Sequence, residues 1–131
     1  MDAVTSSRTR LALVLLVDVV LVIVFAAIGR ATHDGDVLGP LGSGLATTAW
    51  PFLVALVLGW LIARAWRAPL APLRTGLIVW AVTVVVGMVL RAVSGQGVAV
   101  AFVIVASITL ALFLVGWRVV ARLASRRRRA V

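Results

Sequence analysis

Long apolar stretches separated by short polar segments run through almost the whole of this 131-residue chain. Four such stretches occur, each bounded by arginine at one or both ends, at residues 11–29, about 45–63, 75–90 and 98–117. At 1.5 Å per residue, a helix over the first stretch is roughly 28 Å long, close to the thickness of the bilayer hydrocarbon layer. Because open strands cannot satisfy their backbone groups in lipid, the pattern predicts four transmembrane helices.

The segments between these stretches predict where the chain turns. Residues 31–44 are rich in glycine, and residues 92–97 contain the tight turn Ser-Gly-Gln-Gly. Residues 64–74 carry Pro69 and Pro72. Proline lacks the backbone N–H of a helical hydrogen bond, so this linker prevents the second and third helices from merging.

Composition supports a membrane protein. Hydrophobic residues make up 63% of the chain and the mean hydropathy is +1.19, whereas soluble domains contain roughly 45–50% apolar residues. The absence of cysteine excludes disulfide scaffolds and cysteine-ligated metals. The sequence therefore predicts an all-α fold, a four-transmembrane-helix bundle forming a single integral membrane domain over residues 1–131, with a basic tail at 118–131. We expect the first stretch to be retained, because it is too long for a signal-peptide core.

The basic residues, all arginine, are distributed unevenly between the two predicted sides. One side carries only Arg30 and Arg91. The other carries eleven: Arg8, Arg10, Arg64, Arg67, Arg74, Arg118, Arg122, Arg126, Arg127, Arg128 and Arg129. The positive-inside rule then predicts that both termini are cytoplasmic. We read the use of arginine without lysine as a sign of a GC-rich bacterial genome, and expect a multi-pass protein of the bacterial cytoplasmic (inner) membrane. Topology explains the net charge of +9, so we expect no nucleic acid partner.

A faint internal repeat relates the two halves. The first and third stretches end in similar segments around Arg30 and Arg91, and the second and fourth end in the pairs Gly59-Trp60 and Gly116-Trp117. This favours a parallel duplication of a two-helix hairpin. The alternative is chance recurrence of short motifs at equivalent membrane depths.

Asp18 is the one acid inside the predicted spans, where an ionised carboxylate is costly unless it is paired or used. Thr83 and Thr109 lie at nearly the same predicted depth. The third stretch places small and polar residues on one helical face, namely Gly76, Trp80, Thr83, Gly87, Arg91 and Ser94. We expect this face to pack against the Asp18 face of the first helix, with Gly29 and Gly87 allowing close approach.

Asp18 would then meet the Thr83 hydroxyl or the Trp80 indole. Two interpretations remain open. In the first, Asp18, Trp80, Thr83 and Thr109 line a proton or substrate pathway in which desolvation raises the carboxyl pKa. In the second, Asp18 is structural and fixes the register of the helices.

The outer ends of the predicted helices carry a second polar set. Arg30, His33, Arg91, Ser94 and Gln96 could line an outward vestibule that attracts anions or a lipid headgroup. The alternative is that the two arginines extend to the phosphate headgroups.

No cofactor, metal or catalytic set is expected. His33, Asp34 and Asp36 form the only metal-like cluster, and one histidine with two aspartates in a glycine-rich loop lacks the ligand count of a zinc site. With one histidine in the chain, a nucleophile has no second base. We therefore expect that the protein is not an enzyme.

Partner expectations follow from the helices and the tail. The arginines at 126–129 would attract anionic lipids of the inner leaflet. Four thin helices leave little room for a private cavity, so we expect a homo-oligomer or an unidentified membrane partner. Ala55, Gly59 and Ala63 form a small-residue stripe that is typical of helix packing.

Several segments occur in an order and spacing that resemble a known family. They are Phe25-Ala26-Ala27-Ile28-Gly29-Arg30 with His33, Ala49-Trp50-Pro51-Phe52, Gly76-Leu77-Ile78-Val79-Trp80 with Thr83, Gly87 and Leu90-Arg91, Ser94-Gly95-Gln96-Gly97 with Phe102, and Gly116-Trp117-Arg118. Together they resemble the bacterial membrane family catalogued as domain of unknown function 3054. The resemblance implies a four-span fold and carries no assigned activity.

Two functional hypotheses follow. The first is a small transporter or permease-like component that uses the membrane-embedded carboxylate of Asp18. The alternative is a non-catalytic accessory or assembly protein that binds a membrane partner or a lipid.

Overall fold

The structure, a computed structural model, describes residues 2–33 and 43–130, and every element within these ranges is helical. In chain order the elements are α1 Asp2–His33, α2 Ser43–Ala63, the 3₁₀ helix η2 Ala65–Arg67, the π-helix η3 Pro72–Gly76, α3 Leu77–Val93, α4 Val100–Leu110, the π-helix η4 Ala111–Val115 and α5 Gly116–Ala130. Four segments are long and apolar enough to cross a membrane: Ser6–Arg30, Gly44–Ala63, Pro72–Val93 and Val100–Arg128. The predicted all-α fold with four membrane-spanning helices is confirmed.

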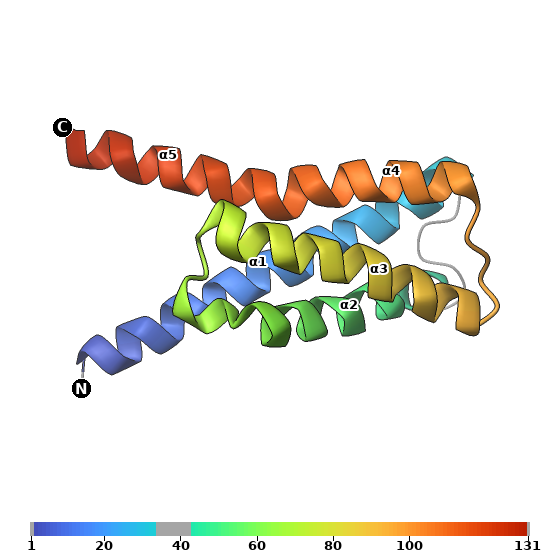
Figure 1. Ribbon diagram of the computed structural model, residues 1–131, viewed down its shortest axis with the longest axis horizontal. Helices are drawn as coiled ribbons and strands as arrows, with labels where there is room; N and C mark the ends of the chain where they lie inside the picture. The colour runs from blue at the N-terminus through green and yellow to red at the C-terminus, as the bar shows by residue number, and fades with distance from the viewer. Residues whose placement is uncertain (1, 34–42, 131) are drawn as a thin grey trace.

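The four spans run alongside one another, and α4, η4 and α5 form one long rod (Figure 1). Both chain ends lie at the same end of the bundle, where α1 and α5 project beyond the other helices, and the linker between α2 and α3 lies there too (Figure 1). We call this the terminal end, and the opposite end, with the turn at residues 94–99, the distal end. Which end faces the cytoplasm stays a prediction.

Two spans belong to longer helices than the sequence predicts. α1 begins at Asp2 rather than at residue 11, and α5 runs to Ala130 through the predicted tail at 118–131. Arginine, alanine and leucine are good helix formers, and no proline or glycine follows Gly116 to end the helix. Arg118 therefore lies inside a helix, although the sequence pattern places it at the end of a span.

α2 and α3 pack closely against each other. A Cβ atom built on Gly59 would lie 3.2 Å from the Cα atom of Val79, so the backbones meet with almost no side chain between them. Ala55 is fully buried on the same stripe of α2. The small-residue stripe is thus used for packing within the chain, as small residues in membrane helices generally are.

The expected approach of α1 and α3 through two glycines is wrong. A Cβ atom on Gly87 would lie 2.8 Å from Cε1 of Phe52, so Gly87 makes room for a ring of α2. Among the described residues, and apart from the neighbouring part of its own helix, no heavy atom lies within 4 Å of a Cβ atom built on Gly29. The reason is steric, because the buried Phe52 ring needs a hole in the facing helix and Gly87 provides it.

An aromatic cluster closes the distal half of the core. The rings of Phe25 and Phe52 meet edge to face with centroids 5.0 Å apart. Phe102 lies 6.4 Å from the first ring and 6.3 Å from the second. These distances fall in the range in which aromatic pairs attract one another, so the cluster ties α1, α2 and α4 together.

Candidate functional site

Asp18, midway along α1, is fully buried and lies at the centre of a charged cluster. Its Oδ1 accepts hydrogen bonds from Trp117 Nε1 at 2.8 Å and from one terminal nitrogen of Arg118 at 2.9 Å. Its Oδ2 accepts from Trp60 Nε1 at 2.8 Å and from the other terminal nitrogen of Arg118 at 2.7 Å. A carboxylate offers about four lone-pair positions, and the four donors occupy them.

Arg118 is equally enclosed. Its side chain has no exposed surface, and its two terminal nitrogens grip the carboxylate as a fork. Two further donors reach backbone carbonyls: Nε donates to the Pro69 oxygen at 2.8 Å, and one terminal nitrogen also donates to the Leu114 oxygen at 2.8 Å. Four described segments of the chain therefore meet at one guanidinium and one carboxylate.

The linker between α2 and η3 places the Pro69 carbonyl. Arg64 adopts the left-handed backbone conformation, with φ 51° and ψ 54°, and turns the chain at the end of α2. Thr75 then donates its hydroxyl back to the Ala68 carbonyl and closes the linker into a loop. The Pro69 oxygen next to that contact accepts a hydrogen bond from Arg118.

Two π-helical turns make space around Arg118. η3 carries Gly76, and a Cβ atom there would lie 3.1 Å from Cδ of Arg118 and 3.5 Å from Cα of Val115. η4 carries Leu114, whose carbonyl accepts a hydrogen bond from the Arg118 guanidinium. A π-turn widens the helix and shifts its backbone hydrogen bonds by one residue, and such turns are frequent at functional sites. Here they let the side chain of Arg118 lie between the third and fourth spans.

The hydrogen-bonding capacity of the Asp18 carboxylate is fully used, which limits the chemistry that this cluster can perform. The carboxylate has no free lone pair for a substrate, and no solvent-exposed surface through which a proton could enter. None of four cavities between described residues is lined by Asp18. The arrangement is a buried ion pair, and removal of one partner should cost about 3–5 kcal/mol of stability.

The partners that the sequence predicts for Asp18 are wrong. Trp80 donates its indole N–H to the Ser107 carbonyl at 2.9 Å, and so joins α3 to α4. Thr83 is fully buried, and its hydroxyl has no hydrogen-bond partner among the described residues. Thr109 lines an apolar groove between α1 and α4. Asp18 instead faces the parts of α2 and of the fourth span that lie towards the terminal end of the bundle. Trp80, Thr83 and Thr109 are therefore not brought to its carboxylate.

Three of the five residues predicted for an outer vestibule do come together. Arg91 bonds the Gln96 side-chain oxygen at 3.0 Å and lies over the Phe102 ring at 4.3 Å. The Ser94 hydroxyl donates to the Arg91 carbonyl at 3.0 Å and accepts from the Gln96 amide at 3.2 Å. Arg91 also donates to the backbone oxygens of Gln96 and Gly97. These bonds close the turn upon itself, and the vestibule stays a prediction.

The remaining predicted residues are placed only in part. The Arg30 guanidinium lies against Gly44 at the start of α2. His33 ends α1, but its side chain is outside the description, and Asp34 and Asp36 lie outside the described residues. Within residues 2–33 and 43–130, no group of three or more metal-ligating side chains occurs.

Sequence reasoning missed Arg118, Trp60 and Trp117 as partners of the carboxylate. It used both tryptophans as signs of a repeat and placed the arginine at the end of a span. Two features of the sequence could have indicated these partners. A buried acid is generally paired with a base, and each tryptophan follows a glycine, in the pairs Gly59-Trp60 and Gly116-Trp117 of the faint repeat. The two indoles donate to the two oxygens of the same carboxylate, and the duplication of the hairpin stays a prediction.

Comparison with family models gives one match, to the family described as a protein of unknown function, DUF3054, over residues 15–121. The matched region includes Asp18, both tryptophans and Arg118, and leaves out the projecting ends of α1 and α5. No curated protein and no solved structure matches the chain. The chain belongs to the DUF3054 family.

Proposed function

We propose that this protein is a non-catalytic accessory component of a membrane assembly, and that its fourth span binds a transmembrane helix of a partner protein. We place it in the cytoplasmic membrane of a bacterium with both termini inside, as the arginine distribution predicts. The observation that carries the proposal is a contrast within the bundle. The charged centre is closed, whereas the fourth span remains largely uncovered.

The closed centre favours an accessory role over transport. A carrier that used Asp18 would have to open a pair whose side chains have no exposed surface, and would leave a charge unpaired while it did so. Transport through Asp18 therefore has less support from the geometry than the accessory role has.

The fourth span is the least covered of the four. Only 17% of its most apolar 18-residue window is buried, against 28%, 39% and 33% for the first, second and third spans. Lipid tails are as apolar as leucine, so exposure alone does not demand a partner. The shape of the surface around this span is therefore the more informative feature.

Two apolar grooves flank the fourth span. One, of 230 Å³, lies between α1 and α4, and the other, of 450 Å³, lies between α3 and the η4 region. Their linings include the small residues Gly29, Ala101, Ala111 and Gly116. Small residues let a second helix approach closely and gain van der Waals contact, which drives helix association in lipid.

The wall of the larger groove has a fixed shape. Trp80 lines it, and the indole N–H of this residue is held by the Ser107 carbonyl across the α3–α4 interface. A wall that is fixed before binding loses little side-chain entropy when a partner helix docks. The grooves are thus suited to a helix with large apolar side chains.

Site-specific photocrosslinking in the native membrane tests this proposal. A photoreactive residue at Ala101 or Ile108, one in each groove, should give one discrete adduct with another protein. The matched controls are Val57 and Leu61 on α2, exposed by 52% and 56%, where no protein adduct is expected. Ala111→Trp, which fills the larger groove, should greatly reduce the Ile108 adduct, whereas Val57→Trp should not. Adducts with lipid alone, or with a second copy of this chain, would overturn the proposal.

A neutral version of the buried pair separates this function from transport. Asp18→Asn combined with Arg118→Gln keeps the shape of the cluster but leaves no group that gains or loses a proton near neutral pH. An accessory protein should keep its crosslinks in this variant. If the unmodified chain in proteoliposomes carries a proton-coupled flux and the neutral variant loses it, transport replaces the accessory function.

A further inference from the structure

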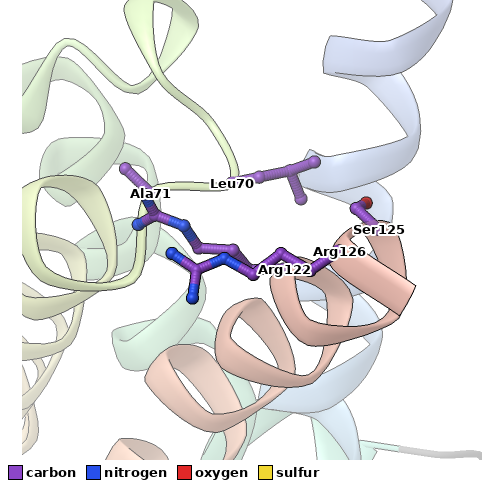
Figure 2. Close-up of a pocket in the computed structure, with 5 residues that line it drawn as sticks. All are labelled: Leu70, Ala71, Arg122, Ser125 and Arg126. Carbon is purple, nitrogen blue, oxygen red and sulfur yellow. The ribbon is translucent and has the colours of Figure 1, made fainter. Parts of the chain in front are cut away.

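A pocket of 410 Å³ lies at the terminal end, between α5 and the linker that precedes η3 (Figure 2). It is far larger than the roughly 30 Å³ that one water molecule occupies. Its lining residues are Leu70, Ala71, Arg122, Ser125 and Arg126. The partner helix proposed for the fourth span does not need this pocket.

Two like charges share the pocket. Arg122 and Arg126 are four residues apart on α5 and so lie on one face of that helix, an arrangement that is unfavourable for like charges. Figure 2 shows both side chains extending together towards Ala71. Among the side chains that the structure describes, no hydrogen bond or ion pair satisfies either guanidinium, and the one carboxylate among them, that of Asp18, is bound to Arg118.

A second pocket, of 320 Å³, adds positive charge on the other side of the same linker. It shares Leu70 and Ala71 with the first pocket, and Arg10 of α1 and Arg67 of η2 line it. Four arginines therefore surround one short segment, in a chain whose net charge is +9. Such clustering raises the local concentration of anions.

We propose that the pocket of Figure 2 binds a phosphate-bearing anion. Each guanidinium presents paired N–H donors that match two oxygens of one phosphate, and a tetrahedral phosphate has enough oxygens for both arginines. The Ser125 hydroxyl supplies a further donor, and Leu70 and Ala71 supply an apolar wall. The anion would relieve the repulsion between Arg122 and Arg126. Its source is either the headgroup of an anionic phospholipid or a soluble phosphate.

Two pairs of substitutions separate a built site from general attraction. Arg122→Gln with Arg126→Gln removes the two pocket arginines, and Arg127→Gln with Arg128→Gln removes two neighbours that do not line it. Each pair lowers the net charge of +9 by two units. The probes are inorganic phosphate, titrated calorimetrically into the full chain in zwitterionic micelles, and dioleoylphosphatidylglycerol, counted by native mass spectrometry against dioleoylphosphatidylcholine.

The pocket pair should weaken binding of the preferred probe by at least about tenfold, because charge-assisted hydrogen bonds are lost. The control pair should weaken it by less than about twofold at physiological salt, where exposed charges are screened. Retention of phosphatidylglycerol that inorganic phosphate displaces would identify a lipid headgroup as the ligand. Phosphate binding without preference between the two lipids would identify a soluble source. Equal effects of the two pairs, or no saturable binding of either probe, would overturn the proposal.

Discussion

The two ends of the bundle each hold an arginine close to the apolar core, and they do so in different ways. At the terminal end, Arg118 has no exposed surface and is paired with the carboxylate of Asp18. At the distal end, Arg91 is partly exposed, lies over the Phe102 ring and bonds the turn that follows its own helix.

The difference lies in what each arginine joins. Arg118 reaches residue 18, one hundred positions away, and the Pro69 carbonyl, so it connects distant parts of the chain. Arg91 bonds partners no more than six residues away. A buried pair between distant segments is lost as a unit, because each charge depends on the other. The hydrogen bonds of the partly exposed Arg91 guanidinium are local, and water or lipid headgroups can replace them.

The largest expected effect is loss of one member of the buried pair. Asp18→Asn alone, or Arg118→Gln alone, should lower the free energy of unfolding by about 3–5 kcal/mol, because one charge remains buried without its partner. The double variant should lose less than either single variant, since it buries no charge. Unfolding of the purified chain by sodium dodecyl sulfate in mixed micelles measures all three. A double variant that loses the full sum of both single effects would show that the two residues act independently.

The next largest effect concerns the hydrogen bonds that Trp60 and Trp117 donate to the Asp18 carboxylate. Trp60→Phe and Trp117→Phe each remove one hydrogen bond to a charged acceptor, which is worth about 1.5–3 kcal/mol. Trp80→Phe removes a hydrogen bond to a neutral carbonyl and should cost about 0.5–1.5 kcal/mol. The same unfolding measurement checks the order. A loss at Trp80 as large as the losses at Trp60 and Trp117 would contradict the special role of the carboxylate.

The spans could be predicted from the sequence because a transmembrane helix is a local property, an apolar run of sufficient length. The burial of Asp18 followed from its place within such a run. Its partners could not be found in the same way, because pairing depends on how distant helices pack. Arg118 follows an apolar run and therefore looks like the end of a span, yet α5 continues beyond it. The π-turns that make room for the Arg118 side chain have no reliable sequence signature. The reason for a glycine at position 76 becomes clear only from its contact with Arg118.

The smallest expected effect concerns the distal arginine. Arg91→Gln should lower the free energy of unfolding by no more than about 1 kcal/mol, because a cation over a ring at a partly exposed site contributes about 0.5–1 kcal/mol. A double-mutant cycle with Phe102→Leu should recover a coupling of that size. The matched comparison is Arg118→Gln, the same substitution at the other end. If Arg91→Gln destabilises the chain as strongly as Arg118→Gln does, the distal turn holds the helices together as the ion pair does, and the contrast between the two ends is lost.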